Sequence, residues 1–533
     1  MAGTHVRLLH SERAPLPGAR VIGPAHADEW IELTVKLRRR KPLPDVTQRP
    51  SEPLSRADLV RQYGADPADI DLVAKTLTPF GLTVVSTDAG SRTVRVAGRL
   101  DAIEKAFDVR LFLYEHERGN YRGRVGPIQV PAALDGIVTG VFGLDDRSVV
   151  RRRPTRPKLA NPGRKRHPHR SWFYPGELAQ IYKFPPGDGT GQTIGLIEFG
   201  GGYFPQDLTQ FGQAAGIASL PRVVPVSVEG VATDARDGAE GEVMLDIEVV
   251  AGICPGATIP VYFSNFTEQG WVDVLDTVMQ DTENAPSVLS ISWGLAEDDP
   301  AWSQGALDAI NEAFKEAALM GITVCVAAGD DGSDDQVGDG HAHVDFPASS
   351  PYVLAVGGTT LTVKAGVPSE KAWKDGDGLR KDGGGSTGGG VSALTTRPTW
   401  QNVEINSVNP GAIVGRVVPD VAADASANTG YFVVVDGNPG ISGGTSAATP
   451  LWAALVARVN SSLGGKRAGF LAPVLYQAYA GGTVGAASCT DIQNGNNTTA
   501  AIGGYSAGPG YDAVTGWGTP VGTQLLTALK AVL

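Results

Sequence analysis

The sequence predicts an α/β protein with a doubly wound, mostly parallel sheet, preceded by a smaller, ferredoxin-like α+β domain. Three observations predict this arrangement. Strand-like and helical periods alternate near the start of the chain, short continuous apolar runs recur later, and a basic, proline-rich stretch separates the two periodic segments. We therefore expect a first domain over residues 1–150, a linker over 151–171 and a second domain over 172–533.

The first domain shows the order β-α-β-β-α-β. Its segments are a strand, two helical stretches, two strands, a helix and a last strand, over 30–37, 56–63, 70–77, 81–87, 92–98, 101–107 and 109–114. This order is the split βαβ pattern of a small sandwich, and it predicts a core over about 29–115. No residue of this domain suggests catalysis.

The second domain contains apolar runs typical of parallel strands that are buried on both faces. The runs are TIGLIEF, SVLSISW, ITVCVAAG and YVLAVGG, and helical stretches such as 302–319 separate them. In such a sheet, ligands bind beyond the carboxyl ends of the strands. The first candidates for a site are therefore the residues at these ends, Glu198, Trp293 and Asp330.

Charge and composition exclude several classes of protein. The chain carries 45 Lys and Arg against 57 Asp and Glu, with net charges of +2 for residues 1–150, +9 for 151–170 and −23 for 171–533. Because so acidic a body repels polyanions, we expect no nucleic-acid partner. The three cysteines are too few and too scattered for a disulfide framework or a zinc site.

The chain shows no membrane-spanning or export signal. No apolar run approaches the roughly 18 residues of a membrane span, so we expect no membrane partner. The start, MAGTHVRLLHSERAPLPG, lacks the apolar stretch of a secretory signal. The linker stretch RRRPTRPKLANPGRKRHPHR has almost no apolar residues, which favours an exposed processing site, with a basic arm for anionic surfaces as the alternative.

Ser446 is the candidate nucleophile. An apolar run and the glycine turn GISGG precede it, and the helical stretch LWAALVARVNSSLG follows, with Pro450 suited to the first turn. Free N–H groups at a helix N-terminus favour a developing oxyanion. An ordinary N-cap serine is the alternative. Ser386 and Ser442 also match the pattern G-x-S-x-G, in less suitable surroundings.

A serine nucleophile needs a base, and two kinds are available. His341 and His343 are the only histidines of the second domain, and they lie in a loop-like stretch. Glu242 and Asp246 lie four residues apart on one face of a predicted amphipathic helix. Crowded carboxylates share a proton, so this pair could accept the serine proton in acid, with Glu242 as base and Asp246 orienting it. A solvated acidic face is the alternative.

Asp330 complements the carboxylate pair. An ionised aspartate would repel an oxyanion, but a protonated one donates a hydrogen bond to it. The arrangement therefore works only where Asp330 holds its proton. The alternative is a loop or capping aspartate within GDDGSDD.

Taken together, these residues resemble the sedolisins, the serine-carboxyl peptidases. The motifs that carry the resemblance follow one another as LIEFGGGY, GEVMLDIEVVAG, SISWG, AAGDDGS, HVDFPASSPYVLAVGGT, GGGSTGGGVS and GGTSAATP. The resemblance spans nearly the whole chain. It implies a subtilisin-like fold, acid endopeptidase activity through an acyl-enzyme, and synthesis as a self-processing zymogen. It also implies a secreted monomer that acts on proteins or peptides and is inhibited by its own prosegment, residues 1–150.

The resemblance also implies a role for individual residues. The nucleophile, general base, base partner and oxyanion stabiliser are Ser446, Glu242, Asp246 and Asp330; the supporting network is Glu198 and Trp293; and a substrate subsite contains Asp345. One residue departs from the family pattern. Asp331 stands where the family commonly has serine, so a second carboxylate adjoins Asp330 and bears on the pH optimum.

The stretch over about 489–517 resembles the calcium loop of the family. The resemblance implies one structural calcium ion, held by the carboxylates of Asp491 and Asp512 and by the carbonyls of Ile492, Gly508 and Gly510. A turn rich in Gly, Asn and Asp is the alternative.

Two other functions remain open at this point. One is a His-dependent serine peptidase of the same fold, and the other is an inactive, peptide-binding homologue. The preferred peptide and the balance between endopeptidase and tripeptidyl cleavage also stay open.

Overall fold

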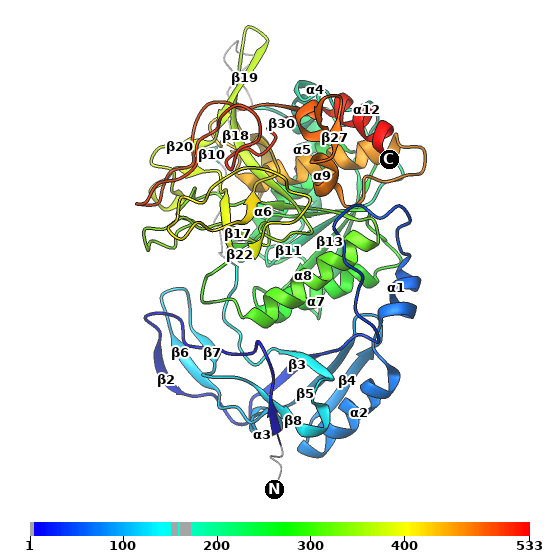
Figure 1. Ribbon diagram of the computed structural model, residues 1–533, viewed down its shortest axis with the longest axis vertical. Helices are drawn as coiled ribbons and strands as arrows, with labels where there is room; N and C mark the ends of the chain where they lie inside the picture. The colour runs from blue at the N-terminus through cyan, green and yellow to red at the C-terminus, as the bar shows by residue number, and fades with distance from the viewer. Residues whose placement is uncertain (1–4, 151–157, 160–171) are drawn as a thin grey trace.

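The computed structural model describes residues 5–150, 158–159 and 172–533. Figure 1 shows an N-terminal domain, in blue and cyan, that lies against two green helices, α7 and α8. The central sheet and the other helices of the C-terminal domain lie beyond these two helices. Within the described ranges, no helix combines the length and apolar character that crossing a bilayer requires.

A four-stranded antiparallel sheet forms the centre of the N-terminal domain. Its order is β4 (Thr83–Asp88), β5 (Thr93–Arg99), β3 (Trp30–Leu37) and β9 (Val138–Phe142). The helices are α1 (Arg56–Tyr63), α2 (Pro67–Leu77) and α3 (Leu100–Phe107). Ser55 and Asp66 accept backbone N–H groups in the first turns of α1 and α2, as N-cap residues do. Inward-facing side chains such as Leu33 and Ile103 form a core of this domain's own.

The prediction that residues 109–114 form the fourth strand of this sheet is wrong. The strand that lies there, β6 (Phe112–Glu115), pairs with β2 (Arg20–Pro24) and β7 (Tyr121–Gly123) in a separate sheet. The fourth position is taken by β9, so this core extends well beyond residue 115. Alternating apolar residues identify a strand but do not determine its partner, which explains the error.

The predicted doubly wound, mostly parallel sheet is confirmed. Eight strands form it, in the order β12 (Arg222–Ser227), β13 (Thr258–Ser264), β11 (Ile194–Phe199), β14 (Val288–Ile291), β16 (Thr323–Ala327), β18 (Leu354–Lys364) and β19 (Val367–Ala372), with β24 (Val421–Asp424) also on β18. All neighbours are parallel except β18 and β19. The four apolar runs are the adjacent strands β11, β14, β16 and β18, whose carboxyl ends lie at one edge.

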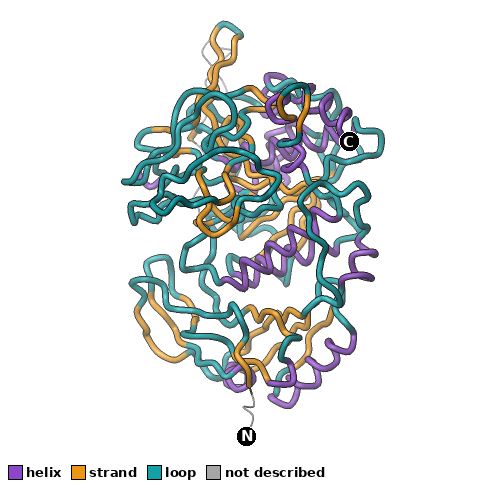
Figure 2. The backbone as a smooth tube through the Cα atoms, viewed as in Figure 1, coloured by secondary structure: helices purple, strands orange, loops and turns teal. Residues whose placement is uncertain are grey.

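Helices cover both faces of this sheet (Figures 1 and 2). One layer contains α7 (Glu268–Gln280) and α8 (Gln304–Leu319), which contact each other, β13 and β16. The other contains α6 (Glu240–Ile253) and α9 (Thr445–Ser461), with α4 (Pro175–Ile181), α5 (Pro205–Ala215) and α12 (Gly522–Val532) beside them. Smaller elements include β15 (Leu295–Ala296), β17 (Asp345–Phe346), β20 (Lys374–Asp375), η3 (Arg380–Asp382), β21 (Gly385–Ser386), β22 (Gly390–Thr396), β23 (Gly415–Val418), β25 (Tyr431–Val435) and β26 (Asn438–Ser442).

Two expectations about the helices are corrected. The helix α6 is not amphipathic, because α4, α5, α9 and β25 surround it and bury all of its residues except Glu240 and Gly252. Pro450 is not in a first turn, because α9 begins at Thr445, directly after Gly444, and continues through the proline. The carboxylates of α6 therefore lie in the interior, where their charge is costly.

Ion pairs connect the N-terminal domain to α7 and α8. Lys36 Nζ of β3 lies 2.7 Å from Asp276 Oδ1 of α7, and Arg95 Nη1 of β5 lies 3.1 Å from Asp273 Oδ2. Arg39 pairs with both Glu316 and Glu312 of α8, with Nε 3.1 Å from Glu312 Oε2. The contact thus sets basic side chains of one domain against acidic side chains of the other.

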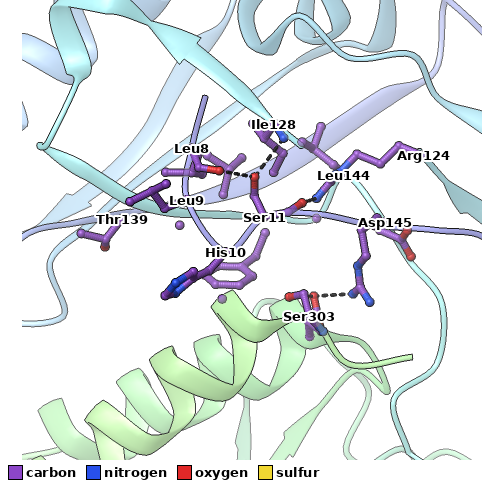
Figure 3. A pocket seen from close by; sticks show the side chains of 17 residues that line it. Leu8, Leu9, His10, Ser11, Arg124, Ile128, Thr139, Leu144, Asp145 and Ser303 are labelled. Carbon is purple, nitrogen blue, oxygen red and sulfur yellow. Dashed lines mark hydrogen bonds and ion pairs between the residues drawn. The ribbon is translucent and has the colours of Figure 1, made fainter. Parts of the chain in front are cut away.

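The start of α8 also contributes to this contact. Figure 3 shows the pocket where residues 8–11 of the N-terminal domain approach Ser303, the N-cap of α8. Ser11 Oγ donates to the Leu8 carbonyl (2.6 Å) and accepts the Ile128 N–H (2.9 Å), which fixes the loop that faces the helix.

Most of the predicted linker, 151–171, and with it the predicted processing site, lies outside the described residues. Lys158–Leu159 are described and form β10, which pairs antiparallel with β26 at Ile441 and Gly440. The linker therefore adds a short strand beside the segment that leads to Ser446.

Candidate active site

Ser446 lies in the first turn of α9, as the second helical residue. The strand β26 ends at Ser442, and Gly444 makes the turn into the helix with φ +102°, a conformation that glycine adopts without strain. A Cβ at Gly444 would lie 2.7 Å from Asp330 Oδ2. Glycine at this position therefore lets Asp330 approach the start of the helix that carries Ser446.

Pro450 has an effect on Ser446 that the sequence analysis did not anticipate. Because proline lacks an N–H, it cannot donate the helical hydrogen bond to the carbonyl of the residue four positions earlier, which is Ser446. Ser292 Oγ lies 3.3 Å from this carbonyl oxygen and donates to Asp246 Oδ2 at 2.7 Å. One hydroxyl thus connects the backbone of the candidate nucleophile to a carboxylate of α6.

Three buried carboxyl groups form a cluster next to α9. Burial raises the pKa of Asp246 well above its usual range, and the neighbouring Glu198 and Glu242 raise it further. Burial likewise raises the pKa of Glu198, against a hydrogen bond of 2.9 Å from Trp293 Nε1, and Glu242 adds to the rise. Because burial and neighbouring carboxyls raise the pKa values of Asp246 and Glu198, the three groups do not all ionise together and can hold and transfer protons in acid.

Glu242 and Asp246 reach this cluster because they lie one turn apart on α6, which packs directly on α9. Glu198 lies near the carboxyl end of β11, and Ser292 and Trp293 follow β14. The structure therefore brings together the predicted residues of α6, α9, β11 and β14.

Asp330 follows β16 and binds the start of α9. Its Oδ1 accepts the Thr445 N–H (2.8 Å) and the Thr445 hydroxyl (2.6 Å). Its Oδ2 accepts a hydrogen bond from Arg380 Nη1 at 2.9 Å, and Arg380 also pairs with Asp331. Asp330 thus binds Thr445, the residue before Ser446, and pairs with a cation, Arg380, that the sequence analysis did not assign.

Asp345 lies at the same edge of the sheet. Asp345 is the first residue of β17. This strand pairs with β15, which begins directly after Gly294. A Cβ on Gly294 would collide with Asp345 Oδ1, so only glycine fits beside this carboxylate. The side chain also approaches Gly329, the residue before Asp330.

The two histidines of the rival mechanism lie in other surroundings. Both ring nitrogens of His343 bond to carboxylates, Nδ1 to Asp298 (2.8 Å) and Nε2 to Asp339 (2.9 Å). These bonds raise the pKa of His343 to about 9, although burial opposes the rise. His341 is exposed and lies 3.5 Å from Asp339. Neither ring forms a hydrogen bond with Ser446 in the described part of the chain.

The predicted calcium loop brings its two carboxylates to one turn. Asp491 Oδ2 accepts the Gly510 N–H at 3.0 Å, and Asp512 Oδ2 accepts the Gly508 N–H at 3.1 Å. Carboxylate and carbonyl oxygens in one compact loop are the donors that calcium prefers, so the residues present fit such an ion.

Known proteins with this organisation are peptidases. A model of the pro-kumamolisin activation domain matches residues 17–147, and a subtilase family model matches 230–509. Kumamolisin of Bacillus sp. (strain MN-32) is 43% identical over 538 residues, which cover 97% of this chain and 95% of that protein. The structure of Pseudomonas sedolisin, a serine-carboxyl proteinase complexed with pseudo-iodotyrostatin, matches with a TM-score of 0.58 at 30% identity. The chain belongs to the sedolisin family.

The match to Pseudomonas sedolisin covers 68% of this chain and 98% of that structure. Tripeptidyl-peptidase sed5 of Aspergillus fumigatus is 33% identical over 98% of this chain and 97% of its own length. This sedolisin is therefore a serine-type peptidase with a subtilisin-like fold. The N-terminal domain is its prosegment, and the chain is a serine-carboxyl peptidase zymogen.

Sequence reasoning did not assign two of the residues that surround this site. Ser292 lies directly before Trp293 in the run SVLSISW, so the rule that selected strand ends could have found it. Arg380 lies 50 positions after Asp330 in the chain, in a polar loop, and no local pattern singles it out.

Proposed function

We propose that this sedolisin is an endopeptidase that acts in acid, with Ser446 as nucleophile, Glu242 as general base and Asp246 as the base's partner. The observation that carries the proposal is the place of Ser292 Oγ, which donates to Asp246 Oδ2 at 2.7 Å and lies 3.3 Å from the Ser446 carbonyl oxygen, with Glu198 and Glu242 as neighbours of Asp246. Glu198 and Trp293 support the base from behind. Asp330, in its protonated form, stabilises the oxyanion, and Asp345 lines a substrate subsite.

In this mechanism, Ser446 Oγ attacks the carbonyl carbon of the peptide bond while its proton passes to Glu242. The oxyanion of the tetrahedral adduct accepts a hydrogen bond from neutral Asp330. The adduct then collapses, the amine takes the proton from Glu242 and leaves, and the acyl group stays on Ser446. Water, deprotonated by Glu242, attacks the acyl-enzyme and releases the second product. Activity in acid follows because Asp330 must keep its proton.

Hydrolysis of a mixed protein substrate in acid tests this assignment. Ser446→Ala and Glu242→Ala should each abolish hydrolysis in a folded protein, and the double variant should lose no more than either single one, because the two act as a unit. Joint replacement of His341 and His343 should leave hydrolysis intact, whereas a His-dependent peptidase would lose it. Sequencing of the fragments separates internal cleavage from the release of tripeptides. Full activity in either single variant, or inactive wild-type protein, would contradict the proposal.

The prosegment is proposed to inhibit the enzyme until acid starts self-processing within residues 151–171. Two features support this: basic side chains of the prosegment pair with acidic ones of α7 and α8, and the net charges of linker and catalytic domain are +9 and −23. Protonation of carboxylates weakens this attraction. The substrates are proteins or peptides, and the enzyme is proposed to act as a secreted monomer.

One structural calcium ion is proposed for the C-terminal loop. Asp491 and Asp512 would supply carboxylate oxygens, and Ile492, Gly508 and Gly510 would supply carbonyls. When bound, the ion would supply a fixed positive charge that holds the loop together and no chemistry to the reaction.

A further inference from the structure

We propose that Asp237 is a positioning residue that fixes Glu242 relative to Glu198, because its side chain joins the start of α6 to the turn that follows β11. The inference rests on the role of Glu242 as general base given under Proposed function. It concerns the loop over 228–239, which connects β12 to α6.

One carboxylate oxygen joins the two segments. Asp237 Oδ1 accepts the Gly201 N–H at 3.0 Å and the Ala239 N–H at 3.1 Å. Gly201 lies three residues after Glu198 in the chain, and Ala239 is the residue directly before α6. Donors from both segments therefore converge on a single atom of this side chain.

The bond to Ala239 extends to the backbone of Glu242. The Ala239 carbonyl accepts the N–H of Glu242 at 3.0 Å and that of Val243 at 3.3 Å, and these bonds begin α6. The side chain of Ala239 forms no capping hydrogen bond. Asp237 therefore holds the peptide on which the turn that contains Glu242 is built.

Two glycines allow this close approach. Gly200 and Gly201 have φ values of +70° and +65°, a conformation that glycine adopts without strain. A Cβ on Gly200 would lie 2.6 Å from Asp237 Oδ2, and a Cβ on Gly201 would lie 2.7 Å from the carbonyl carbon of Ala239. The turn that follows β11 is thus shaped to receive Asp237 and the start of α6.

Two other contacts hold the earlier part of the loop. Gly202 and Asp234 form a β-bridge, and Arg236 pairs with Asp436, which lies in the turn between β25 and β26. Both contacts precede Asp237 in the chain, so neither of them holds the last peptide before α6.

Two bonds of the start of α6 are weaker or more local. The Phe204 N–H donates to Met244 Sδ at 3.4 Å, and a thioether sulfur is a weak acceptor. Glu240 Oε2 accepts the Gly238 N–H at 2.8 Å, a bond that stays within the loop and the first turn of the helix. Asp237 is therefore the carboxylate that connects the helix start to β11.

This connection matters for the proposed reaction. A general base has to lie within hydrogen-bond reach of the proton that it accepts. Without Asp237, the first turn of α6 can shift relative to β11, and a displacement of about 1 Å in an active site costs about a hundredfold in rate. Because Asp237 acts through Glu242 and not through the substrate, the loss should appear in kcat and not in KM.

Steady-state kinetics of peptide hydrolysis in acid, with acid-processed enzyme, test the proposal. Asp237→Ala should lower kcat by about tenfold to a hundredfold and change KM by less than about twofold. Asp237→Asn should restore kcat to near the wild-type value, because an amide oxygen accepts the same two N–H groups. Asp237 is exposed, so neither variant creates a buried cavity.

Glu240→Ala is the matched control. It removes a bond of the same kind, from a carboxylate to a backbone N–H, in the same loop, but one that does not reach β11. Its kcat should stay within about twofold of wild type. Three results would each overturn the proposal: an unchanged kcat in Asp237→Ala, an equal loss in Glu240→Ala, or an asparagine variant as slow as the alanine variant.

Asp237→Glu serves if the alanine variant does not fold. It keeps the charge but moves the carboxylate oxygens farther from the backbone, so kcat should fall, and a wild-type kcat in this variant would overturn the proposal. Inactive wild-type enzyme in acid, or full activity in Glu242→Ala, would defeat the proposed function itself. An active wild type that depends on Glu242, with unaffected Asp237 variants, would reject only the role of Asp237.

Discussion

At the scale of single residues, the site depends on groups that connect its parts. Ser292 is the clearest case, because its hydroxyl donates to Asp246 and lies next to the Ser446 carbonyl that Pro450 leaves without a helical partner. The hydroxyl does not lie on the path of the proton from Ser446. Its effect is to hold a buried carboxyl at a fixed place beside the proposed nucleophile, which matters because small displacements in an active site are costly.

Replacement of Ser292 by alanine is therefore expected to lower kcat and to leave KM nearly unchanged. A hydrogen bond to a charged group contributes about 1.5–3 kcal/mol, which corresponds to a loss of roughly tenfold to a hundredfold in rate. Steady-state kinetics on a peptide substrate in acid provide the measurement. Ser290→Ala is the matched control, since Ser290 lies two residues earlier, in β14, and its buried hydroxyl has no partner among the described residues. Equal rates in the two variants would argue against a positioning role for Ser292.

At the scale of elements, the contact between the prosegment and helices α7 and α8 bears on the proposed release of the prosegment by acid. Burial raises the pKa of Asp273 to about 7, although Arg95 opposes the rise. A carboxyl whose pKa is raised by docking takes up a proton on docking. A fall in pH from 7 therefore makes the contribution of Asp273 to docking of the prosegment more favourable. The proposed release by acid would therefore have to come from other pairs, and Arg39 is the candidate because the side chain of its partner Glu312 is 43% exposed.

Arg39→Gln is expected to move self-processing of the precursor to higher pH. The change leaves Glu316, whose side chain is 7% exposed, without its close cation, and breaking a buried pair costs about 3–5 kcal/mol. The size of the purified precursor, followed over time at a series of pH values, provides the measurement. Arg38→Gln is the control, because Arg38 pairs with Asp69 inside the prosegment. Processing of Arg39→Gln at the wild-type pH would show that this pair does not hold the prosegment.

The elements also show how far the sequence could predict the structure. Continuous apolar runs identified β11, β14, β16 and β18, and helical spacing placed Glu242 and Asp246 on one face of α6. The partner of β6 and the burial of α6 could not be read in this way, because both depend on which distant segments pack against them. Arg380 was missed for the same reason, since only the fold brings its loop to Asp330.

At the scale of the whole molecule, buried carboxyl groups outside the site make the folded chain more stable in acid. Burial raises the pKa of Glu248 and of Asp424 well above the usual range, and it also raises that of Glu370. Such groups bind protons more tightly in the folded chain than in the unfolded one. The free energy of unfolding therefore rises as pH falls through the folded pKa values and stops rising near the unfolded value of about 4.

Glu248→Gln is expected to flatten this pH dependence. One carboxyl contributes at most about 1.4 kcal/mol per pH unit between neutral pH and about pH 4, and the amide removes that slope. Denaturant unfolding at several pH values measures it, in the Ser446→Ala background, which is expected to be inactive, so that the protein does not digest itself. Glu283→Gln, at an exposed position, is the control. A Glu248→Gln slope equal to that of the background would contradict the expectation.

The strand that the linker adds to β26 has a consequence for the kinetics of maturation. Lys158–Leu159 pair with Gly440 and Ile441, a few positions before Ser446 in the same chain. A tethered segment held beside the site has a high effective concentration, which a second molecule in dilute solution does not match. The first cut is therefore expected to be unimolecular, with a half-time that does not change on dilution.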